Sequence, residues 1–245
     1  MEQQTGRGAE PGPEGRGRGR RRRSTMIAGL VAALLAMSVV SAPAPAGAQS
    51  APPEPIVFVH GWSSSPSTWN TMRSRFVAAG FPVDRLFGFG YDTGQSNKTT
   101  ASQLNAYIDR VRAQTGSPVV DLVSHSQGAL GARWCMRSSG CNGKVDDWVS
   151  LAGANHGTLV SLCFWSAGCR EMFYNSDFVK ALNANDETPG SATYTALWSD
   201  RDAVILPNSS AQLASGARNI RVSIGHNDFN GSQAVFDTIR PIVVE

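Results

Sequence analysis

The stretch Val119-Val120-Asp121-Leu122-Val123-Ser124-His125-Ser126-Gln127-Gly128 organises the rest of the chain. Residues 119–123 are mostly β-branched or apolar, which is typical of a strand buried in a parallel sheet. A helix is predicted over 127–137, directly after this strand. The small residues at 124 and 128 let strand and helix approach closely, which lifts the Ser126 hydroxyl above the end of the strand. We therefore predict a strand–turn–helix unit with a serine at its turn.

The same alternation continues on both sides of this unit. Further strands are predicted over 56–59, 86–89, 145–152, 194–199 and 220–224, and helices over 67–79, 99–114 and 232–240. Strands that alternate with helices favour a single α/β domain with a mostly parallel sheet and helices on both faces. Residues 153–191 lack clear periodicity, and we expect short helices there, one of them at about 176–182. Irregular segments of this length are often functional.

The positive charge of the chain is confined to its beginning. The net charge of the 245 residues is +3, but residues 1–48 hold seven arginines against three glutamates. The remaining 197 residues carry 15 Lys and Arg against 16 Asp and Glu, and their basic residues are scattered. This distribution does not predict binding to nucleic acid.

Residues 1–48 have the pattern of a secretory signal peptide. The basic run Arg20–Arg23 precedes an apolar run over 26–40, and Ala46-Gly47-Ala48 fits the small-residue cleavage pattern. The 15 apolar residues are fewer than the roughly 20 that a membrane span needs. We therefore expect secretion, with cleavage near Ala48 and a mature domain over 49–245. Three alternatives remain: an uncleaved membrane anchor, a start site placed too far upstream that lengthens the basic region, and export by the twin-arginine route.

Export also decides how the four cysteines are interpreted. Outside the cytosol they are expected to form disulfides. Three connectivities exist for four cysteines. We favour Cys135–Cys141 and Cys163–Cys169, because each pair closes a short loop. Neither pair has the spacing of a zinc site.

The serine at the turn needs a general base and an acid that orients it. In this architecture the acid and then the histidine follow the serine along the chain. His226 follows the last predicted strand and is the favoured base, with His156 as the alternative. The acid should follow strand 194–199, where Asp202 is favoured over Asp200. The predicted catalytic residues are therefore Ser126, Asp202 and His226.

Acyl transfer also needs two backbone N–H groups that stabilise an oxyanion. One is expected from Gln127, directly after the serine, and the other from Trp62 in His60-Gly61-Trp62 after the first strand. This chemistry requires no cofactor. The motif Gly88-Phe89-Gly90 lacks the third glycine of a dinucleotide-binding fingerprint, and the sequence has no phosphate-binding loop motif. Asp186-Glu187 are acidic neighbours that could bind calcium, but we predict no metal site.

With these residues in place, the chain resembles the secreted class 2 bacterial lipases of the α/β-hydrolase superfamily, such as the compact Bacillus-type lipase and its actinobacterial relatives. The resemblance runs from about Pro55 to the C-terminus, and its specific parts are residues 57–61, 120–128, 151–158 and 194–226. It implies the α/β-hydrolase fold and the same catalytic and oxyanion residues. The chain departs from the pattern at Ser124, at Ala129 and in the longer segment 153–191, which suggests a small flap pinned by cysteines.

The sequence thus predicts a secreted serine carboxylester hydrolase, a triacylglycerol lipase that forms an acyl-enzyme on Ser126. Its partner would be a lipid or another carboxylic ester, and we expect a monomer that contacts a lipid interface transiently. A short-chain carboxylesterase, a cutinase-like polyester hydrolase and a non-catalytic hydrolase-fold binding protein are the alternatives. Substrate contacts are expected mainly from Phe164, Trp165 and Phe229. Further aromatic candidates are Trp62, Trp69, Phe89 and Tyr91.

Overall fold

The computed structural model describes residues 52–160, 163–214 and 216–244. The predicted signal peptide at residues 1–48 lies outside the described residues. Within the described residues, none of the helices is long and apolar enough to cross a membrane.

In the part of the chain that the structure describes, six strands form one sheet, in which every neighbouring pair is parallel. The strands are β1 Ile56–Val59, β2 Leu86–Phe89, β3 Val120–His125, β4 Val145–Leu151, β5 Thr193–Ser199 and β6 Ala217–Val222. Their spatial order is β2-β1-β3-β4-β5-β6. Since all six run in one direction, the loops after β1, β3, β5 and β6 leave the same edge of the sheet.

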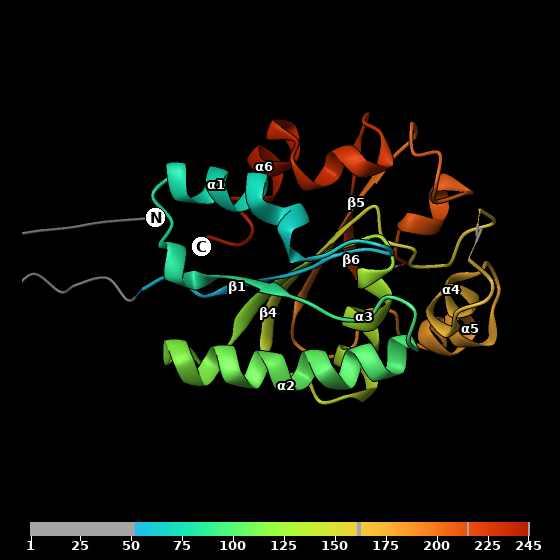
Figure 1. The fold of residues 1–245 in the computed structure, drawn as a ribbon, viewed down its shortest axis with the longest axis horizontal. Helices are drawn as coiled ribbons and strands as arrows, with labels where there is room; N and C mark the ends of the chain where they lie inside the picture. Colours follow the sequence, from blue (N-terminus) through green and yellow to red (C-terminus); the bar gives the residue numbers. More distant parts are fainter. Residues whose placement is uncertain (1–51, 161–162, 215, 245) are drawn as a thin grey trace, which may run out of the picture. The chain divides into compact units, whose positions relative to one another are not determined.

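Helices cover both faces of the sheet, as Figure 1 shows. The α-helices are α1 Asn70–Ala78, α2 Asn97–Thr115, α3 Gly128–Ser138, α4 Ala167–Met172, α5 Asp177–Asn183 and α6 Gln233–Ile239. Four 3-10 turns are η1 Pro66–Trp69, η2 Val83–Arg85, η3 Asn208–Ala211 and η4 His226–Asn230. Helices α2 and α3 lie on one face, and α1 and α6 lie on the other.

The core is divided by the sheet into two apolar clusters. On the α2 side, Leu104 and Ile108 pack against Val57 and Leu122 of the strands. On the opposite side, α1 and α6 pack over Phe58, and this cluster includes Phe229. A third cluster joins α4 and α5 to α3 at the carboxyl edge of the sheet. Burial on both faces explains why residues 56–59 form an uninterrupted apolar run.

Most predicted elements occur in the structure within a few residues of their expected bounds. The helix expected over 67–79 begins instead as the turn η1, with Pro66 in its first position, and becomes α-helical at Asn70. The strand expected over 220–224 runs from Ala217 to Val222. It is an edge strand and none of its residues is fully buried, so apolar residues do not mark its beginning.

Asp121 is a buried carboxyl group on β3, at the edge of the sheet opposite the loops after the strands. Burial, and then the negative charges of Glu54 and Asp147, raise its pKa to about 9 from the ordinary value of 3.8. The folded protein therefore keeps a proton that the unfolded chain releases near pH 4, so folding stability falls as the pH rises from about 4 to 9.

We expect Asp121→Asn to raise Tm at pH 8 by about 4 °C, which corresponds to about 1–2 kcal/mol for a domain of this size. Thermal unfolding measured from pH 5 to 9 checks this prediction. The wild type should lose stability over that range faster than the variant. Asp84→Asn, at an exposed position, is the matched control. If Tm of Asp121→Asn fell with pH as steeply as in the wild type, the buried proton would have no effect.

Candidate active site

Ser126 lies in the sharp turn between β3 and α3. Its φ of 55° is in the left-handed region, which serine rarely adopts. The turn packs tightly against the end of β1. A Cβ atom at Gly128 would lie 2.5 Å from the carbonyl oxygen of His60, and one at Gly61 would lie 2.8 Å from Cβ of Ser126. Glycine is therefore required at both positions, and the strained turn presents the serine hydroxyl at the carboxyl edge.

The position before the turn, where the common motif has glycine, is occupied by Ser124. This residue is fully buried, and its hydroxyl accepts a hydrogen bond of 3.0 Å from the indole of Trp148. Its own proton is directed at the carbonyl oxygen of Val149, 3.4 Å away. The departure from the common motif is thus accommodated by two hydrogen bonds to β4.

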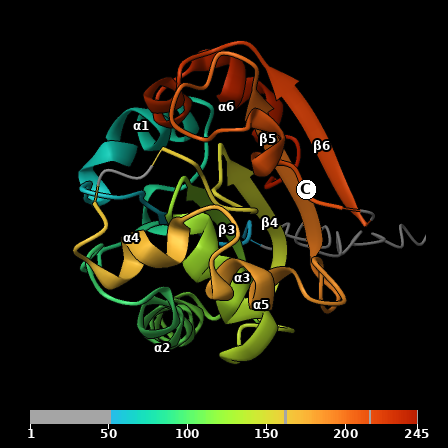
Figure 2. The same ribbon diagram turned by 90° about the vertical axis from the view of Figure 1, so that its right-hand side faces the viewer.

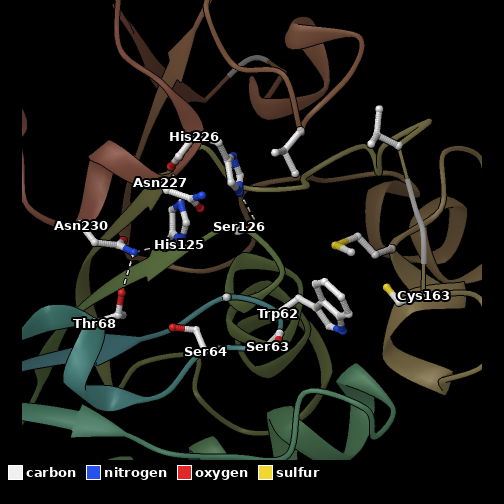
Figure 3. A pocket seen from close by; sticks show the side chains of 14 residues that line it. Trp62, Ser63, Ser64, Thr68, His125, Ser126, Cys163, His226, Asn227 and Asn230 are labelled. Atoms are coloured by element: carbon white, nitrogen blue, oxygen red, sulfur yellow. Dashed lines mark hydrogen bonds between the residues drawn. The ribbon is translucent and has the colours of Figure 1, made fainter.

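The structure brings Ser126, His226 and Asp202 together in one hydrogen-bonded chain. The distance from Nε2 of His226 to Oγ of Ser126 is 2.9 Å, and Nδ1 of His226 lies 2.8 Å from Oδ2 of Asp202 (Figure 3 shows the first contact). The three side chains come from the loops after β3, β5 and β6. With Nδ1 donating to the carboxylate, Nε2 carries the lone pair that can take the serine proton.

The environment of Asp202 favours its charged form. Burial raises the pKa of this carboxyl group, whereas the hydrogen bond and the charge of His226 lower it. The backbone N–H groups of Val204 and Ile205 donate to Oδ1 at 2.8 and 2.9 Å and lower the pKa further. The net result is a pKa below the ordinary value, so Asp202 stays ionised opposite His226.

The two alternative residues are engaged elsewhere. Asp200 forms an exposed ion pair with Arg221 and accepts a hydrogen bond from Ser223 at 3.0 Å. His156 pairs with Glu187 at 2.9 Å. Neither Asp200 nor His156 contacts Ser126 or His226.

The backbone amides of Trp62 and Gln127 flank the serine from two sides. None of the hydrogen bonds among the described residues uses either N–H group. The loops that carry them are fixed by neighbouring contacts. The hydroxyl of Tyr91 donates to the carbonyl oxygen of His60 at 2.7 Å, and the Gln127 side chain donates to the carbonyl oxygen of Thr93 at 3.0 Å. Two free N–H groups beside a nucleophile can act as an oxyanion hole.

His125 has a position that the sequence did not predict. Its Nε2 lies 3.0 Å from the carbonyl oxygen of His226, and Nδ1 lies 3.4 Å from the side-chain nitrogen of Asn230. Burial, and then the neighbouring His226, lower the pKa of His125 to about 3, so the ring is neutral at neutral pH. His125 thereby connects the turn that carries Ser126 to the loop that carries His226.

A cavity of about 510 Å³ opens beside the serine. Its lining comprises Gly61, Trp62, Ser63, Ser64, Thr68, His125, Ser126, Val160, Cys163, Met172, Val204, His226, Asn227 and Asn230. Of the aromatic residues expected to contact substrate, Trp62 is present in this lining.

The other aromatic candidates lie elsewhere, and the expectation for Phe229 is wrong. Phe229 is fully buried in the core between the sheet and the helices α1 and α6, so no substrate reaches it. Trp69 and Phe89 are core residues as well. Phe164 and Trp165 are 71% and 68% exposed and lie outside the cavity lining.

The cysteines form the two favoured pairs. Cys135–Cys141 joins the end of α3 to the loop before β4, and Cys163–Cys169 closes a loop beside the cavity. The acidic neighbours Asp186-Glu187 do not converge: Glu187 bonds His156 and the backbone of Ala214. Among the described residues, no group of three acidic, histidine or cysteine side chains could hold a metal ion.

Known sequences similar to this chain include one family and, among the curated proteins, two lipases. The family model described as Lipase (class 2) matches residues 53–240. A triacylglycerol lipase of Burkholderia plantarii is 32% identical over 111 residues, covering 42% of this chain and 30% of the relative. A triacylglycerol lipase of Pseudarthrobacter phenanthrenivorans is 33% identical over 88 residues, covering 33% and 27%. The matched region thus spans less than a third of the length of either relative.

Solved structures agree on the fold. The mature Bacillus licheniformis lipase BlEst2 matches with a TM-score of 0.68 at 16% identity, covering 82% of this chain and 96% of that one. Aspergillus fumigatus lipase B matches with a TM-score of 0.63 at 17% identity, covering 75% and 51%. These likenesses, with the six parallel strands, confirm the predicted α/β-hydrolase fold.

Proposed function

Since the chain belongs to the class 2 lipase family, we propose that it hydrolyses lipid esters, triacylglycerols among them, through an acyl-enzyme on Ser126. The observation that carries this proposal is the continuous chain of hydrogen bonds from Asp202 through His226 to Ser126. It lies at the floor of a cavity large enough for an ester and its acyl chain.

The proposed reaction follows from this geometry. Oγ of Ser126 attacks the ester carbonyl carbon while its proton passes to Nε2 of His226. The N–H groups of Trp62 and Gln127 stabilise the resulting oxyanion. When the tetrahedral intermediate collapses, the C–O bond to the alcohol breaks and His226 gives its proton to the leaving oxygen. Water then attacks the acyl-enzyme while His226 takes its proton. The bond between the acyl carbon and Oγ breaks, His226 returns the proton to Oγ of Ser126, and the acid leaves.

Two apolar surfaces favour a lipid as the ester. The apolar residues of the cavity lining are Trp62, Val160, Cys163, Met172 and Val204. Beside the cavity, the rim loop (residues 163–172) exposes the side chains of Phe164 and Trp165. Adjacent exposed aromatic side chains mark interaction surfaces, and tryptophan is well suited to the boundary between water and lipid.

The rim loop is held in place by several bonds. The disulfide Cys163–Cys169 closes it, and the guanidinium of Arg170 donates to the carbonyl oxygens of Phe164 and Trp165 at 3.3 and 3.2 Å. Glu171 accepts hydrogen bonds of 2.6 Å from the hydroxyl of Ser96 and the N–H of Asn97, at the beginning of α2. We propose that this fixed loop makes the transient contact with a lipid surface.

Hydrolysis of emulsified trioctanoylglycerol, alongside p-nitrophenyl esters of increasing chain length, tests the proposal. We expect activity on the emulsion and on long acyl chains. The double variant Phe164→Ser/Trp165→Ser should lose about 10-fold on the emulsion, because two large apolar side chains no longer enter the lipid. Its activity on soluble p-nitrophenyl butyrate should stay within about twofold of the wild type.

Val83→Ser is the matched control, since Val83 is 64% exposed and lies before β2, at the opposite edge of the sheet. It should leave both activities unchanged. Activity restricted to short soluble esters would contradict the lipase proposal and favour a short-chain carboxylesterase. Hydrolysis of a polyester without hydrolysis of the emulsion would favour the cutinase-like alternative.

We further propose that residues 1–48 are a signal peptide and that the monomeric domain over 49–245 acts outside the cell. The arginine-rich start, the short apolar run and Ala46-Gly47-Ala48 support this, and the two disulfides suit an oxidising compartment. The intact mass of the chain recovered from the culture medium checks the cleavage site. A mass that includes residues 1–48 would contradict it.

A further inference from the structure

The cavity beside Ser126 has two walls of different chemistry. In Figure 3, Thr68, His125, Asn227 and Asn230 lie on one side of Ser126, and Trp62 and Cys163 lie on the other. The Cys163 side is apolar, with Met172 and Val204 in the same packed cluster. The Asn230 side is polar and comes from three different elements, η1, η4 and the end of β3.

Several polar atoms of the Asn230 side lack a partner. The side-chain nitrogen of Asn230 is directed at the hydroxyl oxygen of Thr68 at 3.1 Å and at His125. The side-chain oxygen of Asn230 is buried, since the residue is only 8% exposed. None of the described residues donates a hydrogen bond to it. This oxygen has almost no accessible surface, so the contribution of Asn230 to the cavity is to hold Thr68 in place through its side-chain nitrogen.

The neighbours of Asn230 add complementary groups. Thr68 accepts the bond from Asn230 with its oxygen, which leaves its hydroxyl proton free to donate. Asn227 also faces the cavity, and its side chain makes no hydrogen bond within the described part of the chain. The polar side therefore offers the hydroxyl proton of Thr68 and the amide of Asn227, a donor and an acceptor that suit a hydroxyl group.

The chemistry of the site decides which part of an ester enters this space. An acyl chain there would cover unpaired amide and hydroxyl groups with methylene groups, which is unfavourable. It is therefore expected on the apolar side. The leaving oxygen must receive its proton from Nε2 of His226, and Asn227 and Asn230 follow His226 within the same turn η4. The alcohol part accordingly lies against the polar side.

We propose that the site selects esters whose alcohol part carries a free hydroxyl group, such as partial acylglycerols, and binds that hydroxyl with Thr68 and Asn227, while Asn230 holds Thr68 in position. This inference rests on the proposed ester hydrolysis and refines its substrate class. A site that hydrogen-bonds a substrate hydroxyl discriminates against the analogue that lacks it, because its own polar groups are then left unpaired.

The test compares 1-hexanoylglycerol with propyl hexanoate, both in solution below aggregation. The two esters share the acyl chain and the three-carbon alcohol skeleton and differ in two hydroxyl groups. The ratio of kcat/KM for the glycerol ester to kcat/KM for the propyl ester is divided by the ratio of their alkaline hydrolysis rates, which corrects for intrinsic reactivity. We expect this corrected ratio to be at least about 10 for the wild type. Thr68→Val and Asn227→Leu should each lower this corrected ratio about fivefold.

Because the readout is a ratio, a variant that merely packs poorly lowers both rates and leaves the ratio unchanged. Val204→Ala is the matched control on the apolar side, since it alters contacts with the acyl chain that both esters share.

A corrected wild-type ratio near one would overturn the inference without any variant, while ester hydrolysis itself would stand. Ratios unaffected by both Thr68→Val and Asn227→Leu would also overturn it. Absence of hydrolysis of both esters would overturn the proposed function and this inference with it.

Discussion

Replacing Ser126 with alanine should lower kcat for ester hydrolysis by about 10⁶-fold, the loss found when a catalytic serine is removed from a triad. The oxygen that would form the acyl-enzyme is then missing, and His226 has no hydroxyl to deprotonate. The strained turn should survive, since alanine is as small as serine and Gly61 and Gly128 still give it room.

Rates on p-nitrophenyl butyrate and the mass of the protein after treatment with a fluorophosphonate measure this effect. The wild type should gain one adduct on the peptide that contains Ser126, and Ser126→Ala should gain none. Ser67→Ala, at an exposed position in η1, should behave as the wild type. Undiminished hydrolysis by Ser126→Ala would remove the catalytic assignment. A wild type that neither hydrolyses esters nor reacts would support a non-catalytic binding protein.

Asp202→Asn should lower kcat by about 10⁴-fold while leaving the fold intact. The backbone N–H groups of Val204 and Ile205 donate to Oδ1 of Asp202, so the carbonyl oxygen of an asparagine would take that position. Its NH₂ group would then face Nδ1 of His226, which would have to accept a hydrogen bond. The ring proton would move to Nε2, and the atom facing Ser126 would no longer be a base.

Steady-state rates with a soluble ester, together with Tm, check this prediction. Asp200→Asn is the control, because Asp200 lies two positions away in an exposed pair with Arg221, and it should retain wild-type kcat. A loss for Asp200→Asn as large as that for Asp202→Asn would show that the loop matters, and not the contact with His226. An Asp202→Asn variant with nearly full activity would exclude an orienting carboxylate.

Local sequence patterns account for much of this architecture. Residues 56–59 are apolar at every position and form β1, buried on both faces. Leu104, Ile108 and Val111 share one face of α2 and pack on the sheet. Ser124, Ser126 and Gly128 mark the turn after β3 because its tight geometry restricts the residue types there. The short loops also make the two favoured disulfides predictable.

Other features depend on residues that are distant in the chain. Phe229 was expected among the aromatic residues that contact substrate, yet its ring lies in the core between the sheet and the helices α1 and α6. No local pattern predicts the contact between Nε2 of His125 and the carbonyl oxygen of His226, since the two residues are separated by 101 positions. The bounds of the short helix α4 were not predicted from the sequence. This helix is held against α2 by Glu171 and is tied to its preceding loop by Cys163–Cys169.

The sequence by itself determined which residues can react: a serine in a strained turn, an acid and a histidine after later strands, and two glycines that permit close approach. These features depend on local backbone geometry, and local geometry restricts residue type. Only the tertiary structure decided what surrounds them. Parallel strands bring η1, η4 and the rim loop to one edge of the sheet, and there the polar side at Asn230 and the apolar side at Cys163 lie on either side of Ser126. Such neighbours are set by the packing of distant segments, which no short stretch of sequence encodes.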